Sequence, residues 1–230
     1  MRISVYTMTW DRLEYTRHCF ASLEERAGHH YTHVVLDQGS TDGTVEWLKE
    51  WVKHGDRRVL YSPVNLGNAV GNNRAIEAVI AADRQLKPDL IVRMDNDCEV
   101  ISGAILSNIA ELYNCIGRYD KKYVISPHVE GIVNQPHRAR YKWFGQFKLG
   151  IVAVIGGLFR VVPTDVLQRY RWPEAQNQIH GEESSFCQWF KDHGGEVAYA
   201  EDLIVSHFRG TDQQALDYPE YHARKMILAK

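Results

Sequence analysis

The stretch LIVRMDND occupies residues 90–97 and joins a short apolar run directly to two acidic residues. Leu90 to Met94 has the length and composition of a buried strand, which predicts a place near the centre of a sheet. Residues two apart in an extended segment point to the same side, so Asp95 and Asp97 can face one site. Two neighbouring carboxylates are costly unless a cation neutralises them, and their oxygens suit Mg²⁺ or Mn²⁺. A polar turn that caps the next helix is the alternative interpretation.

The residues before this stretch alternate short β-rich runs with helical patterns. Strands are predicted at residues 3–7, 33–37 and 58–61, and helices at 13–23, 42–52 and 68–82. This order predicts right-handed βαβ crossovers and a parallel sheet, in which ligands bind at the carboxyl ends of the strands. Polar clusters follow predicted strands at 7–11, 37–44 and 95–97. We therefore expect a ligand site at this edge of the sheet.

The second half of the chain has a less regular pattern. Helices are predicted at residues 102–116 and 182–193, and strands at 123–126, 155–162, 197–199 and 203–205. The basic and aromatic segment 134–149 is interpreted as a surface loop. No linker or repeat divides the sequence, so we expect a single domain over residues 1–230 with halves at 1–100 and 101–230.

The composition excludes several classes of protein. A formal net charge of −2 provides no global positive field for nucleic acid or an anionic membrane. The four cysteines form no C-x-x-C pair, which argues against a zinc site and predicts reduced, packed thiols. No apolar run approaches the ~20 residues of a transmembrane segment. A cytoplasmic protein is the expectation from this pattern.

Five blocks of sequence, in order, resemble the GT-A fold glycosyltransferases, most closely the family-2-like group. The first three are TMTWDR at 7–12, DQGSTDGT at 37–44, which is close to the family's D-x-G-S-x-D-G-T, and NLG at 65–67 with Asn73. The fourth is the D-x-D signature at 95–97, and the fifth combines GGLF at 156–159, GEE at 181–183 and SHFR at 206–209.

The resemblance implies an α/β, Rossmann-like fold whose mostly parallel central sheet is flanked by helices. A smaller mixed sheet is expected on the acceptor side. Residues 1–100 would then bind a nucleotide-diphosphate sugar, and residues 101–230 would bind the acceptor and include the C-terminal segment. The implied reaction is a metal-assisted transfer of a sugar to an acceptor hydroxyl.

The resemblance also implies roles for residues that would bind the nucleotide. Asp37 would accept a hydrogen bond from the base, which favours a UDP-sugar donor, although an Asx-turn acid is the structural alternative. The remaining positions would lie beside the base, ribose and diphosphate: Thr7, Thr9, Asn65, Gly67 and Asn73. Asp42 is better explained as a helix N-cap.

Metal and diphosphate binding are implied for residues near both ends of the chain. Asp97 would bind Mn²⁺ or Mg²⁺ directly, Asp95 would contact the metal or ribose, and His207 would be a third ligand. Arg209 could neutralise the diphosphate leaving group, with an exposed residue of a C-terminal tail as the alternative.

The acceptor block departs from the family pattern. Similar enzymes commonly have Glu-Asp where this chain has Glu182 and Glu183, so Glu183 is the leading candidate for the catalytic base and Glu182 the second. Both acids could instead stabilise the start of a helix. Similarity to family 2 favours inversion of the anomeric centre, but retaining GT-A enzymes, which need no such base, resemble the chain as well.

Three further alternatives concern the activity and the acceptor. A nucleotidyltransferase is disfavoured because residues 7–12 contain no glycine for a phosphate-binding loop. A non-catalytic nucleotide-sugar-binding module is consistent with the altered Glu182–Glu183 pair. The basic and aromatic residues 137–144 make DNA or another anionic polymer a conceivable acceptor, but a saccharide or small molecule is the preferred prediction.

Overall fold

The computed structural model describes residues 1–82, 87–118, 122–132, 135–174 and 182–228. The first half contains β1 (Ile3–Thr9), α1 (Leu13–Arg26), β2 (Tyr31–Gln38), α2 (Thr44–Trp51), β3 (Arg57–Ser62), α3 (Gly67–Ala82) and β4 (Leu90–Met94). The second half begins with β5 (Cys98–Val100), α4 (Ile105–Ile116), β6 (Tyr123–Glu130), β7 (Arg140–Phe144), β8 (Phe147–Ile151) and β9 (Phe159–Pro163). It ends with α5 (Thr164–Leu167), α6 (Glu182–Asp192), β10 (Glu196–His207), α7 (Gly210–Asp217) and α8 (Pro219–Leu228).

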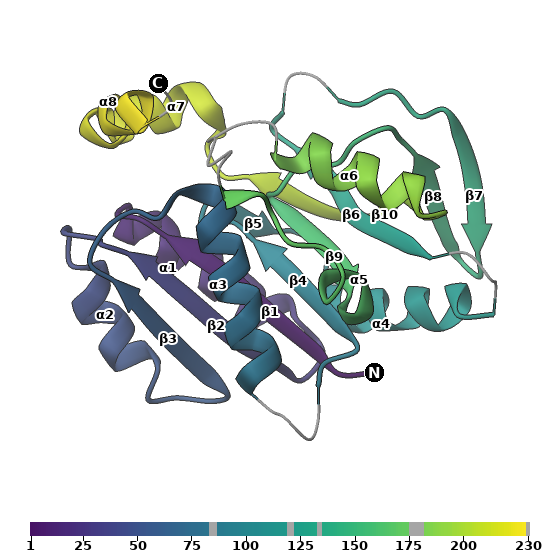
Figure 1. Ribbon diagram of the computed structural model, residues 1–230, viewed down its shortest axis with the longest axis horizontal. Coiled ribbons are helices and arrows are strands. Elements are labelled where there is room, and N and C mark those ends of the chain that lie inside the picture. The colour runs from purple at the N-terminus through teal and green to yellow at the C-terminus, as the bar shows by residue number, and fades with distance from the viewer. Residues whose placement is uncertain (83–86, 119–121, 133–134, 175–181, 229–230) are drawn as a thin grey trace.

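One sheet runs through both halves of the chain (Figure 1) in the order β3-β2-β1-β4-β9-β6-β10-β8-β7, and β5 pairs with the end of β10. The first four strands are parallel, and β9 joins them to the mixed part by pairing antiparallel to β4. The predicted α/β fold with parallel and mixed regions is confirmed. The mixed region is continuous with the parallel one, because β9 pairs with β4 on one side and with β6 on the other.

The strand order determines which face each early helix covers. The chain steps from β1 to β2 to β3 in one direction and returns past β1 to β4. Right-handed crossovers therefore place α1 and α2 on one face and α3 on the other, where Figure 1 shows α3 in front of the sheet. Phe20 of α1 packs against Trp51 of α2 with ring centroids 4.9 Å apart. This arrangement leaves the carboxyl ends of the strands open for a site.

The segment predicted as a surface loop contains a β-hairpin instead. Strands β7 and β8 pair antiparallel from Arg140↔Ile151 to Phe144↔Phe147. The strand pattern was hidden because charged side chains of β7 point toward a buried acid: Arg140 Nη2 and Lys142 Nζ lie 2.5 and 2.7 Å from the carboxylate of Glu196. Inward-facing charges remove the apolar alternation by which a strand is recognised.

The end of the sheet also differs from the prediction. The two short strands expected at 197–199 and 203–205 form one strand, β10, whose register against β6 shifts between Ala200 and Ile204. A bulge of this kind absorbs extra residues without ending the strand. After β10, α7 and α8 pack above the carboxyl ends of the parallel strands (Figure 1). Within the described ranges, no helix is long and apolar enough to cross a membrane.

Packing in the first half encloses a histidine. His33 of β2 is 2 % exposed, and its ring lies 4.5 Å from that of Phe20 and 5.2 Å from that of Trp51. Its Nε2 atom is 3.0 Å from the hydroxyl of Thr7. Burial, with a smaller contribution from Arg57, lowers the pKa of His33 from 6.5 to about 3. The folded protein therefore holds this imidazole in its neutral form.

The unfolded chain binds a proton at His33 as the pH falls below 6.5, whereas the folded chain does so only near pH 3. The contribution of the neutral His33 to the free energy of unfolding is therefore complete above pH 6.5 and is lost as the pH falls from 6.5 to about 3. We expect the His33 contribution to decrease by about 1 kcal/mol between pH 7 and pH 5.5. Urea unfolding at both pH values should show this loss in the wild type and a smaller loss in His33→Gln. Equal pH dependence in the two proteins would contradict the assignment.

Candidate active site

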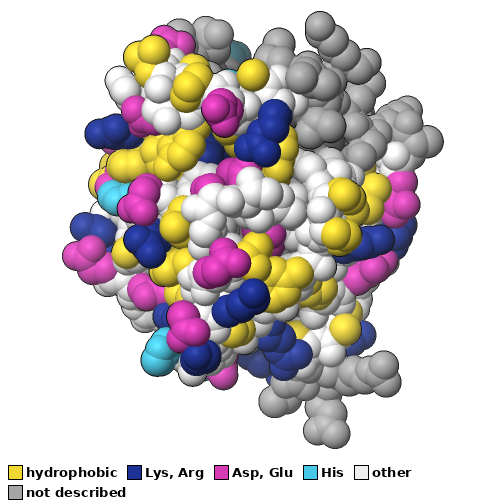
Figure 2. Space-filling view, turned by 90° about the vertical axis from the view of Figure 1, so that its left-hand side faces the viewer, with side chains coloured by type: hydrophobic (Ala, Val, Ile, Leu, Met, Phe, Trp, Pro, Cys, Tyr) yellow, Lys and Arg dark blue, Asp and Glu magenta, His cyan; other side chains and the backbone are white. Residues whose placement is uncertain are grey.

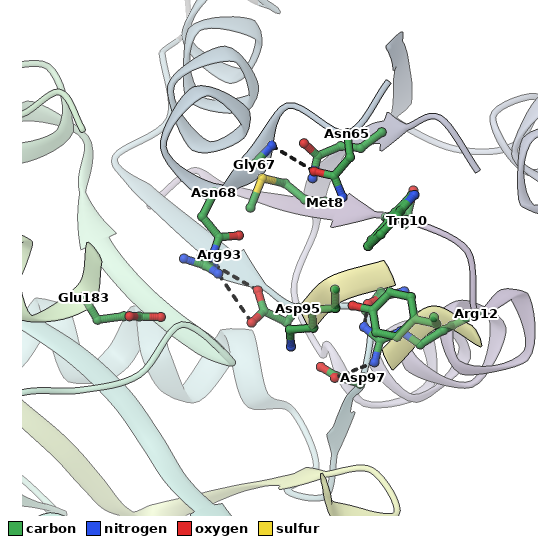
Figure 3. Close-up of a pocket in the computed structure, with 15 residues that line it drawn as sticks. Met8, Trp10, Arg12, Asn65, Gly67, Asn68, Arg93, Asp95, Asp97 and Glu183 are labelled. Carbon is green, nitrogen blue, oxygen red and sulfur yellow. Dashed lines mark hydrogen bonds and ion pairs between the residues drawn. The ribbon is translucent and has the colours of Figure 1, made fainter. Parts of the chain in front are cut away.

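A pocket of about 300 Å³ opens at the carboxyl ends of the parallel strands. Its walls come from the ends of β1 and β4, the start of α3, the first turn of α6, and α8. Figure 3 shows Asp95 and Arg93 between Trp10 and Arg12 on one side and Glu183 on the other. The D-x-D segment therefore lies where the sequence predicted, at the edge of the sheet where polar clusters meet.

Asp97 is the most heavily neutralised acid in this pocket. It is 8 % exposed, and its Oδ2 atom lies 3.0 Å from Arg12 Nη1 and 3.4 Å from His207 Nε2. Burial alone would raise the pKa of Asp97, but Arg12 and the hydrogen bond from His207 outweigh it and hold the pKa well below its usual range. Asp97 is therefore an ionised carboxylate at neutral pH.

Backbone pairing explains how His207 reaches this acid. Strand β5 pairs with β10 so that Cys98 lies opposite His207, and the amide of Phe208 donates to the carbonyl of Asp97 at 2.8 Å. The predicted proximity of Asp97 and His207 is therefore present in the structure. Atoms 3.4 Å apart can occupy neighbouring positions around one ion, because ligands at ~2.1 Å in an octahedral site are about 3 Å from each other.

Asp95 is held apart from that pair by Arg93. The guanidinium Nε of Arg93 donates to Asp95 Oδ1 at 2.9 Å, and the Asp95 amide donates to the carbonyl of Leu158 at 2.9 Å. Burial raises the pKa of Asp95, and Arg93 offsets only part of this effect. The structure thus separates the two acids of the D-x-D segment into two ion pairs.

The donor set fits a divalent ion with two protein ligands better than one with three. Among the described residues, no three His, Cys, Asp or Glu side chains are arranged around a common point. The adjacent atoms are Asp97 Oδ2 and His207 Nε2, and Nε2 also lies 3.3 Å from Nε2 of Gln214. Mg²⁺ and Mn²⁺ commonly complete their coordination with water and phosphate oxygens, so a two-ligand site is chemically adequate.

Besides Asp95, three of the residues predicted to bind the nucleotide line the pocket: Thr9, Asn65 and Gly67. Asn65 Oδ1 accepts a hydrogen bond of 2.8 Å from the amide of Gly67, which holds the turn before α3 against the pocket. Gly67 has φ +74°, a left-handed conformation that glycine adopts without strain. These residues shape the wall on the β1 and α3 side.

Asp37 is occupied by its own turn. Its Oδ1 accepts the amides of Gly39 and Ser40 at 3.1 Å, and its Oδ2 accepts the hydroxyls of Thr9 and Ser40 at 3.0 and 2.5 Å. A carboxylate has about four acceptor positions, and all are used here. In this conformation Asp37, which is 1 % exposed, makes the Asx-turn that was the structural alternative. Its contact with a base stays a prediction.

Three more predicted residues point away from the pocket. Thr7 is bonded to His33, and the amide of Asn73 binds the backbone of Trp172, with Nδ2 2.9 Å from the carbonyl and Oδ1 3.0 Å from the amide. Arg209 is half-exposed and pairs with Asp217 at 2.9 Å. Each of these side chains forms a hydrogen bond or an ion pair with a residue that folding brings close. The spacing of residues in the sequence does not reveal these partners.

The acid predicted as the base is placed across the pocket from the wall formed by β1 and α3. Glu183 lies in the first turn of α6, and Figure 3 shows its carboxylate directed toward Asp95. It forms no hydrogen bond or ion pair within the described residues. The side chain of Glu182 and the preceding residues 175–181 lie outside the described part, so the prediction for Glu182 is not addressed.

Several pocket residues were not assigned from the sequence: Trp10, Arg12, Arg93, Tyr221 and Lys225. Trp10 and Arg12 belong to the TMTWDR block at 7–12, and Arg93 lies in the LIVRMDND stretch at 90–97. Tyr221 and Lys225 belong to no block, and only their helical spacing of four residues links them.

Residues 4–178 match the sequence profile of glycosyl transferase family 2. The chain belongs to this family. A Bacillus subtilis (strain 168) protein described as a teichuronic acid biosynthesis glycosyltransferase, TuaG, is 32% identical over 76 residues, which cover 33% of this chain and 30% of TuaG.

Solved structures of other glycosyltransferases share the GT-A fold with this family 2 chain. S. aureus TarS 1–349 in complex with UDP-GlcNAc matches at a TM-score of 0.66 and 15% identity, covering 94% of this chain and 61% of that one. GalNAc-T7 with UDP, GalNAc and Mn²⁺ matches at a TM-score of 0.72 and 14% identity, covering 92% of this chain and 44% of that one. The chain thus spans less than two thirds of these proteins.

The position of Arg93 depends on a glycine of the GGLF block in this family 2 chain. A Cβ atom on Gly157 would lie 2.5 Å from Arg93 Cζ, whereas one on neighbouring Gly156 would meet nothing within 4 Å. We expect Gly157→Ala to cost about 1–3 kcal/mol, because the buried guanidinium must move from Asp95. Gly156→Ala is the matched control and should unfold in urea close to the wild type. Equal stability of the two variants would contradict this role of Gly157.

Proposed function

We propose that this protein transfers a sugar from a nucleotide-diphosphate sugar, preferably a UDP-sugar, to an acceptor hydroxyl with the help of a divalent metal ion. The observation that carries the proposal is that Asp97, which lines the pocket together with Glu183, lies 3.4 Å from His207 behind it. Membership of glycosyl transferase family 2 supports the reaction class. The UDP and UDP-GlcNAc complexes of structural neighbours support the donor class.

The donor is proposed to lie along the wall formed by β1 and α3. The Trp10 ring lines the pocket and, with Arg224 packed over it, offers its remaining flat surface to a base. Asn65 and Gly67 offer polar backbone to ribose. The diphosphate would then reach the ends of β4 and β5. With Asp37 saturated inside its turn, the ring of Trp10 is the principal base-binding surface proposed in this conformation.

Mn²⁺ or Mg²⁺ held by Asp97 and His207 would supply positive charge for the diphosphate leaving group. The role of this chain's residues is to keep Asp97 ionised and His207 beside it, with Asp95 restrained by Arg93. Arg12 shares Asp97 Oδ2 with His207, so it provides counter-charge to the acid from the protein itself. Asp95 is proposed to face the ribose or water, consistent with its separation from the pair.

Glu183 is proposed to act as the base. The bond between the anomeric carbon and the diphosphate oxygen breaks with its electron pair left on the diphosphate. The acceptor oxygen bonds to that carbon, and its proton passes to Glu183. The position of Glu183 across the pocket from Trp10 supports attack from the face opposite the leaving group, which inverts the anomeric centre.

A saccharide hydroxyl is the proposed acceptor. The basic segment that suggested DNA has its cations paired: Arg138 with Glu201, and Arg140 and Lys142 with Glu196. On the opposite side of the molecule, where α2 and β3 lie, Figure 2 shows positive and negative side chains interspersed as well. TuaG is described as a teichuronic acid biosynthesis enzyme, which supports a saccharide polymer as the acceptor class.

The metal site is tested by calorimetric titration of UDP in Mn²⁺ and in EDTA. We expect the wild type to bind at least about tenfold more tightly in Mn²⁺, a difference of ~1.4 kcal/mol. His207→Ala should lose this difference while its circular dichroism spectrum stays unchanged, because it removes a ligand without unpairing Arg12. His54→Ala, at an exposed position outside the pocket, is the control. Equal wild-type affinity in Mn²⁺ and EDTA would refute the metal role.

The base is tested by Glu183→Gln, which is expected to retain UDP binding and to lower transfer roughly 10²–10⁴-fold. Transfer is measured as UDP release from UDP-sugars in the presence of a panel of saccharides. Asp192→Asn, at the far end of the same helix, should transfer at the wild-type rate. Near wild-type transfer by Glu183→Gln would favour the retaining alternative. Wild-type UDP binding without any transfer would favour the non-catalytic module.

A further inference from the structure

Helix α8 forms part of the pocket wall although it is the last element of the chain. Tyr221 and Lys225 line the pocket, and a spacing of four residues places them on one face of the helix. Both residues come after residue 178, where the match to family 2 ends. In Figure 1 the helix lies above the carboxyl ends of the parallel strands, where the diphosphate of the proposed donor would be.

The contacts of α8 fix its position over the turn that follows β1. Arg224 forms an ion pair with Asp11, and the Tyr221 ring lies 4.3 Å from the guanidinium carbon of Arg12 and 5.2 Å from the ring of Trp10. Gln214 of α7 is buried and accepts a hydrogen bond of 2.9 Å from Arg12 Nη1. The C-terminal helices are thus attached to the residues that hold Asp97.

That turn has a strained backbone. Asp11 and Arg12 both have positive φ, +52° and +62°, although neither is a glycine. The strain is held by Asp11 Oδ1, which accepts the Thr41 amide at 2.7 Å, and by the ion pair to Arg224 on α8. Strained non-glycine residues persist only where their surroundings hold them, and such positions concentrate at functional sites.

The charges that line the pocket leave one cation available. Arg12 is paired with Asp97 and Arg93 with Asp95. The ammonium group of Lys225, in contrast, forms no hydrogen bond or ion pair within the described residues, although it lines the same pocket. An ammonium group presents three donors and a compact charge, which suits phosphate oxygens.

We propose that Lys225 binds the diphosphate of the donor and that α8, anchored through Arg224 and Tyr221, closes this side of the donor pocket. The inference rests on the proposed function, because it assigns a ligand to the same pocket. Lys225 would pair with charge that increases on the diphosphate as the sugar leaves. Arg224 is a positioning residue, since its ion pair is to the turn and it does not line the pocket. Tyr221 lines the pocket and packs on the same turn, so it helps to hold the helix there.

The test compares UDP with UMP, which lacks the second phosphate, by calorimetric titration in Mn²⁺. Lys225→Gln is expected to weaken UDP binding roughly 10- to 100-fold, as for a lost charge-assisted contact, and to weaken UMP binding much less. Lys225→Arg should recover most of the UDP affinity. Lys53→Gln, which removes the same charge from an exposed site outside the pocket, should bind both nucleotides as the wild type does.

The anchoring role is tested separately with Arg224→Gln. This variant keeps Lys225, so UDP binding should weaken less than in Lys225→Gln while limited proteolysis after α7 becomes faster. Equal loss of UDP and UMP affinity in Lys225→Gln would show a structural role and overturn the diphosphate contact. Unchanged UDP affinity in that variant would overturn it as well. Absence of UDP binding by the wild type would instead overturn the proposed function.

Discussion

The buried carboxylate of Asp97 is the constraint on which the site depends. A charge that is 8 % exposed must be compensated, and the compensation comes from Arg12 in the turn between β1 and α1 and from His207 at the end of β10. Asp97 thus connects a residue that follows the parallel strand β1 with a residue of β10, in the mixed part of the sheet. The same Arg12 then contacts Gln214 and Tyr221, so the two C-terminal helices are organised around one acid.

The burial of Asp97 also determines which charged groups of the pocket are already paired. The two acids of the D-x-D segment are each paired with a different arginine, Asp97 with Arg12 and Asp95 with Arg93. Glu183 and Lys225 are left at the pocket surface without such partners among the described residues. A ligand that enters therefore meets one acid and one cation able to form new contacts, an arrangement suited to a hydroxyl and a diphosphate.

The family match covers only part of this machinery. It ends at residue 178, whereas Glu183, His207 and Lys225 lie beyond it. The wall proposed to bind the nucleotide lies within the matched residues. Glu183, His207 and the C-terminal wall of the pocket come after them, and Glu183 and His207 belong to the GEE and SHFR segments that carry part of the resemblance.

Periodicity in the sequence predicts the alternating elements of the first half and the edge of the sheet at which polar residues gather, because both are local properties of the chain. The nearness of Asp97 to His207 was implied by the resemblance to GT-A glycosyltransferases and not by any local pattern. The partner of each charged group, in contrast, depends on the folded chain. Arg12 and Asp97 are 85 residues apart, and Asp37 was saturated by a turn that no spacing rule distinguishes from a base-binding acid. The β7–β8 hairpin escaped prediction because its charges face Glu196. Pairing depends on distances in space, whereas a sequence pattern reports only which face of its own element a residue occupies.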